Sequence, residues 1–98
     1  PIMTDDQKPA VVLLVEDEAL VRMFADEVLT EDGGFKVIAT ANADEAITIL
    51  RVRGDVRVLF TDVNMPGSMN GLALAHEVHA RWPDIRIVVA SGLGLPGH

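Results

Sequence analysis

Acidic and hydroxyl side chains directly follow three apolar runs of this chain. Glu16-Asp17-Glu18, Asp62 and Ser91 each come immediately after such a run, and each run has the length of a buried strand. In open α/β sheets, ligands bind at the edge where the carboxyl ends of the strands meet. Carboxylates there would hold a divalent cation, and a hydroxyl would hydrogen-bond a phosphate group. The spacing therefore predicts a divalent-cation and phosphate site.

Asp62 is the residue best placed to act as a nucleophile, since a carboxylate oxygen can attack phosphorus and form an acyl phosphate. Both reacting groups are anionic, so the reaction needs Mg²⁺ or Mn²⁺, which take oxygen ligands. We expect Asp17 and Asp62 to be carboxylate ligands. Glu16 would bind directly or through water, and the backbone carbonyl of Asn64 would supply a further oxygen. Crowded carboxylates repel one another, so their pKa values should rise in the empty site.

A structural interpretation of the same residues is also open. Glu16-Asp17-Glu18 could be first-turn acids stabilised by a helix dipole, and Asp62 could be a turn residue ahead of Pro66. Three polar groups at three strand ends favour the site over this alternative.

The elements expected to position these groups alternate along the chain. The strands are expected at about 10–16, 35–39, 56–61 and 85–90. Helical periodicity between them predicts an apolar stripe on the first helix, formed by Val21, Phe24, Ala25, Val28 and Leu29. Asn42 with Glu45 predicts the start of the second helix, and Asn70-Gly71 predicts the start of the third. We expect Met23 and Trp82 in the core or at its edge. Alternation with short connections predicts a parallel sheet with right-handed crossovers.

Length, net charge and cysteine content indicate the number of domains, the kind of partner and the cellular location. The 98 residues suit one domain, with 1–9 as a disordered lead-in and 10–98 as the folded unit. The formal net charge of −7 makes nucleic acid an unexpected direct partner. No cysteine is present and no apolar run is long enough to span a membrane, which fits a cytoplasmic location.

Three segments together resemble a known family. Leu14-Val15-Glu16-Asp17-Glu18, Phe60-Thr61-Asp62-Val63-Asn64-Met65-Pro66 with Gly71, and Val88-Val89-Ala90-Ser91-Gly92 look like the receiver domain of bacterial two-component response regulators. The resemblance implies that Asp62 accepts a phosphoryl group from a sensor histidine kinase or a phosphotransfer protein. It implies that Glu16 and Asp17 form the acidic pocket around Mg²⁺. It also implies that Ser91 hydrogen-bonds the phosphoryl group and reports its presence.

The family fold is a three-layer, flavodoxin-like (βα)5 arrangement with a parallel sheet in the order 2-1-3-4-5. This chain departs from the family pattern. Its acidic pair is Glu-Asp rather than the commoner Asp-Asp, and Ser91 stands where Thr is more usual. Only βαβαβαβ is expected here, without the fourth helix, fifth strand, fifth helix or the Lys that follows the fifth strand. The chain would then be part of a longer receiver, or a short one with another cover such as a homodimer through an exposed sheet edge.

The function expected from the resemblance is a phosphorylation switch rather than an enzyme. Autodephosphorylation should be slow at most, because Leu93, two residues after Ser91, is apolar and cannot orient a water. One alternative is a degenerate receiver that binds a protein partner without phosphorylation. An aspartate-nucleophile phosphatase is a weaker alternative, because Asn64 stands where such enzymes carry a second acid.

Overall fold

Four parallel strands form one sheet in the computed structural model, which describes residues 8–65 and 69–90. The strands are β1 (Val11–Val15), β2 (Lys36–Thr40), β3 (Val56–Asp62) and β4 (Arg86–Ala90). Their order across the sheet is β2-β1-β3-β4. The predicted parallel sheet is therefore confirmed over these strands, and β1 and β3 are direct neighbours. The predictions made for residues 1–7, for the Pro66-Gly67 turn and for residues 91–98 lie outside the described residues.

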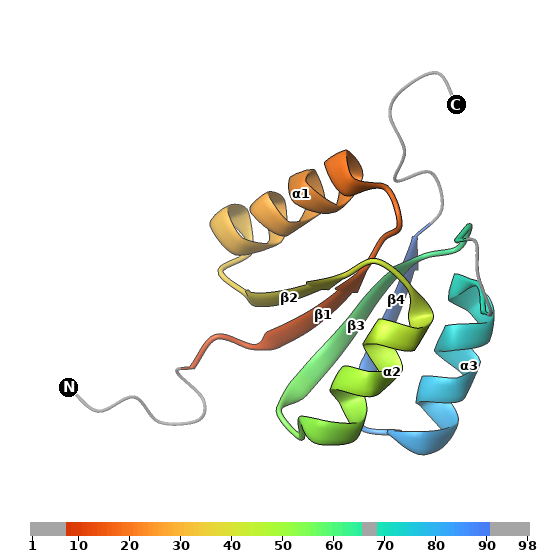
Figure 1. Cartoon of the computed structure of the whole chain (residues 1–98). Helices are drawn as coiled ribbons and strands as arrows, with labels where there is room; N and C mark the ends of the chain where they lie inside the picture. Colours follow the sequence, from red (N-terminus) through yellow and green to blue (C-terminus); the bar gives the residue numbers. More distant parts are fainter. Residues whose placement is uncertain (1–7, 66–68, 91–98) are drawn as a thin grey trace.

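Helices cover both faces of this sheet, which gives three layers (Figure 1). One face carries α1 (Ala19–Glu27), which continues into the π-helical segment η2 (Val28–Asp32). The other face carries α2 (Ala43–Val52) and α3 (Gly71–Arg81). No helix among the described residues is both long enough and apolar enough to cross a membrane.

Side-chain caps start the second and third helices at the predicted residues. The Asn42 side chain accepts a hydrogen bond from the backbone N–H of Glu45 (2.9 Å), and Glu45 Oε1 accepts one from Ala41 (2.8 Å). The Asn70 side chain accepts a hydrogen bond from the backbone N–H of Ala73 (2.9 Å). Such bonds satisfy N–H groups that have no partner within a helix, so they fix where each helix begins.

The hydrophobic core lies between the sheet and the helices α2 and α3. Alternate residues of β1 point to this layer because side chains alternate across a strand. The buried members of this core are Val11, Leu13, Val15, Ala43, Ala46, Leu50, Val56, Leu59, Met65, Leu74 and Val78. Trp82 packs against its edge, as predicted.

The prediction for the first helix was partly wrong. Val21 is buried, but Phe24 is 68% exposed, Val28 is 38% exposed and Met23 is 65% exposed. Within the described residues, α1 is the single helix on its face of the sheet, so its outer flank has no apolar surface to contact. Val88 of β4, two strands away from β1 in the sheet, is also 44% exposed.

Both outer strands of the described sheet have one free side. β4 pairs with β3 and β2 pairs with β1. Unpaired strand edges can recruit another chain. The homodimer through such an edge stays a prediction.

Candidate functional site

Three carboxylates converge at the carboxyl edge of the sheet. One carboxylate oxygen from each of Glu16, Asp17 and Asp62 lies within 4.8 Å of the others. The cause is the pairing of β1 with β3, in which Val15 lies opposite Thr61. The residues that follow Val15 therefore lie beside the last residue of β3. The arrangement concentrates negative charge in one pocket, which is the environment that a hard divalent cation requires.

Glu16 is the most deeply placed of the three, with 1% of its surface exposed. Its Oε2 accepts a hydrogen bond from the backbone N–H of Glu18 (2.8 Å), whereas its buried Oε1 has no hydrogen-bond partner among the described residues. Burial, together with the nearby carboxyl groups of Asp17 and Asp62, raises the pKa of Glu16 to about 7. A buried acceptor oxygen without a donor, on a side chain of the carboxylate cluster, fits a Mg²⁺ site.

The backbone around Asp62 is held in place by the core. The buried Thr61 hydroxyl donates to the carbonyl of Asp62 (3.1 Å) and lies 3.9 Å from the sulfur of Met65. Met65 is itself buried, so it anchors the loop that follows the strand. The N–H of Asn64 donates to Asp62 Oδ1 (3.3 Å), while its backbone carbonyl as a cation ligand stays a prediction.

Gly71, the first residue of α3, contacts the backbone of Asp62 directly. A Cβ atom at this glycine would lie 1.8 Å from the carbonyl oxygen of Asp62. The N–H of Gly71 also donates to the carbonyl of Val63 (3.0 Å). Only a residue without a side chain allows this approach, so Gly71 fixes where α3 packs against the end of β3.

Arg22 on α1 is a residue that the sequence reasoning missed. Its guanidinium donates to the backbone carbonyls of Glu16 (2.8 Å) and Asp17 (3.4 Å). It is the only Lys or Arg between Lys8 and Lys36. A single positive charge shortly after an acidic cluster is the sequence feature that could have identified it. The guanidinium holds the backbone that carries two of the three carboxylates, and its charge offsets part of their repulsion.

Replacing Arg22 with glutamine should weaken Mg²⁺ binding by about 10-fold, because groups that orient ligands contribute on this scale. Isothermal titration with MgCl₂ measures the affinity. Arg51→Gln is the matched control, since it removes one exposed positive charge on α2, away from the carboxylates. An equal loss in both variants would show that net charge alone matters and that Arg22 does not position the acidic residues.

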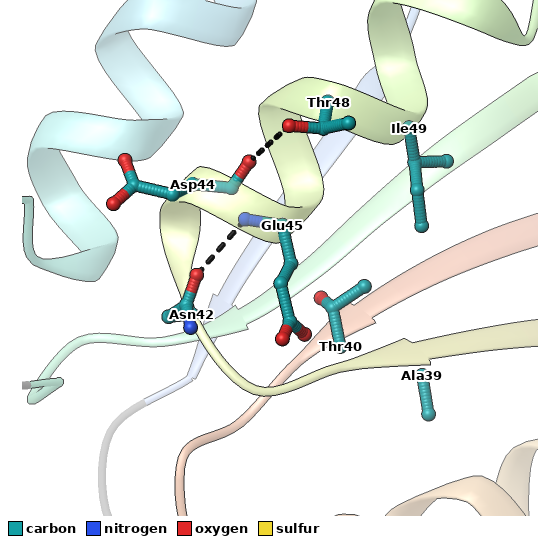
Figure 2. A pocket seen from close by; sticks show the side chains of 7 residues that line it. All are labelled: Ala39, Thr40, Asn42, Asp44, Glu45, Thr48 and Ile49. Carbon is teal, nitrogen blue, oxygen red and sulfur yellow. Dashed lines mark hydrogen bonds between the residues drawn. The ribbon is translucent and has the colours of Figure 1, made fainter.

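A second hollow, of about 520 Å³, lies between the end of β2 and the first turn of α2 (Figure 2). Its polar groups are already used within the fold. Asn42 and Glu45 make the capping bonds described above, and the Thr48 hydroxyl donates to the carbonyl of Asp44 (2.9 Å). The Thr40 hydroxyl donates to the carbonyl of Leu14 (2.8 Å). The residues that line this hollow therefore serve to cap α2 and to hold β2, and the hollow is not a candidate site.

Ser91 lies outside the described residues, so its contact with a phosphoryl group stays a prediction. Glu16, Asp17 and Asp62 are the predicted residues that the structure brings together. The assignment of these three as cation ligands, and of Asp62 as phosphoacceptor, stays a prediction.

Comparison with known proteins gives a consistent family. The model of the response regulator receiver domain matches residues 12–94. The hydrogenase transcriptional regulatory protein HoxA of Cupriavidus necator is 39% identical over 85 residues, which are 87% of this chain and 17% of that protein. A chemotaxis protein CheY homolog of Campylobacter jejuni is 35% identical over 85% of this chain and 65% of its own length. The chain thus spans less than two thirds of either relative.

A solved structure agrees with these relatives. The response regulator protein TrrA of Thermotoga maritima, determined in complex with Mg²⁺-BeF, superposes with a TM-score of 0.75 at 28% identity. The match covers 83% of this chain and 68% of that one. Together with the parallel sheet order and the carboxylate cluster after β1 and β3, these matches show that the chain belongs to the response regulator receiver domain family.

Proposed function

We propose that this chain is a phosphorylation switch in which Asp62 accepts a phosphoryl group from the phosphohistidine of a sensor histidine kinase or a phosphotransfer protein. The observation that carries the proposal is the convergence of Glu16, Asp17 and Asp62 within 4.8 Å, with a buried oxygen of Glu16 lacking a donor. Membership of the receiver family supports it.

The proposed transfer is a displacement at phosphorus. A carboxylate oxygen of Asp62 forms the new P–O bond, and the P–N bond to the donor imidazole breaks. The electron pair of that bond stays on the imidazole nitrogen, which then takes a proton. A bound Mg²⁺ or Mn²⁺ would supply charge neutralisation for the anionic groups that must approach one another. Asp17, Asp62 and Glu16 would hold the cation, with the carbonyl of Asn64, and Ser91 would donate to a phosphoryl oxygen.

Acetyl phosphate provides a direct test because it supplies a phosphoryl group without a partner protein. The chain is incubated with acetyl phosphate and MgCl₂, and its intact mass is measured with and without EDTA. We expect a phosphorylated species that depends on the metal. An unchanged mass, together with no binding of beryllofluoride, would contradict the proposal and favour a module that binds partners without phosphorylation.

Replacing Glu16 with glutamine should separate stability from cation binding. The pKa of Glu16 in the fold, about 7, lies above its ordinary value of 4.5, so the folded state holds the proton more tightly. The free energy of unfolding therefore falls as pH rises from about 4.5 to 7. The loss of stability from ionising Glu16 is complete above pH 7. Glu16→Gln should raise the free energy of unfolding of the metal-free chain by roughly 1–3 kcal/mol at pH 8 and by less at pH 5.

The same variant should lose part of its response to Mg²⁺. Ligand binding to the folded state stabilises it, by about 2.7 kcal/mol at 100 times the dissociation constant. Urea unfolding in EDTA and in MgCl₂ measures both effects. A Glu16→Gln variant that is less stable than the parent at pH 8 in EDTA would show that the ionised Glu16 carboxylate does not destabilise the fold.

The alternatives receive less support from the site. A phosphatase of the aspartate-nucleophile type needs an acid two residues after the nucleophile, and Asn64 cannot donate that proton. The intact carboxylate cluster favours the switch over a degenerate receiver. We place the switch in the cytoplasm, with a kinase or phosphotransfer protein as partner and no direct contact with nucleic acid.

A further inference from the structure

The amino-terminal edge of the sheet, opposite to Asp62, carries a half-enclosed cavity of about 490 Å³. Residues 9–11 line it, together with the charged residues Lys8, Lys36, Asp55 and Arg57. We call it the basic pocket. Its volume is in the range of small-molecule sites, about 300–1,000 Å³.

The topology brings the cations of the basic pocket together from separate segments. Val11, the first residue of β1, pairs with Lys36 on one side and with Val56 on the other. The next pair is Val12 with Val58, so the residue between them, Arg57, is the extra residue of a β-bulge. Bulges redirect side chains and are frequent beside functional sites. The irregularity in β3 thus coincides with the residue that contributes a guanidinium to the cavity.

Asp55, the one acid among the described residues of the lining, is already paired with an arginine outside the pocket. Arg53 makes two hydrogen bonds to the Asp55 carboxylate, at 2.9 and 2.7 Å. This pairing, and to a smaller extent the charge of Lys36, lowers the pKa of Asp55 to about 2. Asp55 therefore remains ionised and bonded to Arg53. The side chains of Lys36 and Arg57 are exposed. The described lining thus has more positive than negative side chains, on a chain whose formal net charge is −7.

We propose that the basic pocket binds a small polyanion that carries two or more phosphate or carboxylate groups. A guanidinium recognises either group in a bidentate manner, and the ammonium groups add point charges. The cavity is larger than a single phosphate requires, and Lys36 and Arg57 line it from two different strands, so a ligand with several anionic groups fits better than a monoanion. A long polyanion such as nucleic acid is disfavoured, because it would extend over a surface that is acidic overall.

Binding to the basic pocket should not depend on phosphorylation of Asp62, because the pocket and the carboxylate cluster lie at opposite ends of β1 and β3. The probe is inorganic triphosphate, titrated into the whole chain in metal-free, low-salt buffer and followed by isothermal calorimetry. We expect saturable binding to one site, with the same affinity in Asp62→Asn. Citrate, titrated in the same way, distinguishes a carboxylate ligand from a phosphate ligand.

The key variant is Lys36→Gln combined with Arg57→Gln, which should weaken the binding of the preferred anion by at least about 10-fold, as the loss of two charge-assisted contacts implies. The matched control, Arg51→Gln with Arg86→Gln, removes two exposed positive charges that do not line the basic pocket and should change affinity by less than about two-fold. Arg57→Lys keeps the charge but loses the bidentate geometry, so it should give an intermediate loss.

Two results would overturn the proposal. One is the absence of saturable binding for both triphosphate and citrate. The other is an equal loss of affinity in the pocket variant and the control, which would indicate diffuse attraction to positive charge. In the first case, saturable binding of a short oligoglutamate peptide would indicate a protein partner instead of a small molecule.

Discussion

We expect Asp62→Asn to take up no phosphoryl group from acetyl phosphate, whereas the parent chain should take one up. The amide lacks the anionic oxygen that attacks phosphorus, so the loss should be complete at the sensitivity of intact-mass measurement. The substitution keeps the size of the side chain, and Oδ1 can still accept the hydrogen bond from the N–H of Asn64. We therefore expect the fold and the thermal stability to change little.

Asp84→Asn is the matched control for this variant, because Asp84 is an exposed acid between α3 and β4, outside the carboxylate cluster. It should be phosphorylated as the parent is. If Asp62→Asn were phosphorylated to the same extent as the parent, the phosphoryl acceptor would have to be another residue. Fragment mass spectrometry of the modified parent would identify that residue.

Gly71→Ala should both destabilise the chain and reduce phosphorylation. The added methyl group would meet the carbonyl oxygen of Asp62 at 1.8 Å and its carbonyl carbon at 2.7 Å. These are backbone atoms of a core strand and cannot rotate away, so α3 must separate from the end of β3. Overpacking of this kind costs about 1–3 kcal/mol, and sometimes more. The displacement would act on the backbone of the acceptor residue itself.

Gly54→Ala is a suitable control, because a Cβ there would contact nothing within 4 Å. Urea unfolding of both variants measures the free energy of unfolding, and acetyl phosphate with MgCl₂ measures phosphorylation. We expect Gly54→Ala to match the parent in both assays. Equal stability of Gly71→Ala and Gly54→Ala would show that the packing of α3 against Asp62 tolerates a side chain.

The sequence was sufficient for the elements whose causes are local. Side-chain caps begin helices where Asn42 and Asn70 occur, because an N-terminal N–H is satisfied by a side chain only a few residues away. The apolar runs predicted the four strands of the described sheet, and the position of Asp62 at the end of its run predicted its place at the sheet edge. The acidic residues could be assigned to one edge because parallel strands share a direction.

Other features depended on which segments meet, and the sequence alone did not determine them. The first helix has an apolar stripe, yet Phe24 is exposed because burial requires a second surface, which the described residues do not supply. Periodicity specifies which face of a helix is apolar but not what contacts it.

The details of the site likewise required the tertiary structure. The bonds from Arg22 to two carbonyls, the unpartnered oxygen of Glu16 and the close approach of Gly71 to Asp62 join residues whose relative positions are set by packing. The bulge at Arg57 is a matter of register between two strands. Local propensity determined the elements and the types of chemistry available in this chain, whereas distances between atoms of different elements were decided only when the sheet and helices packed together.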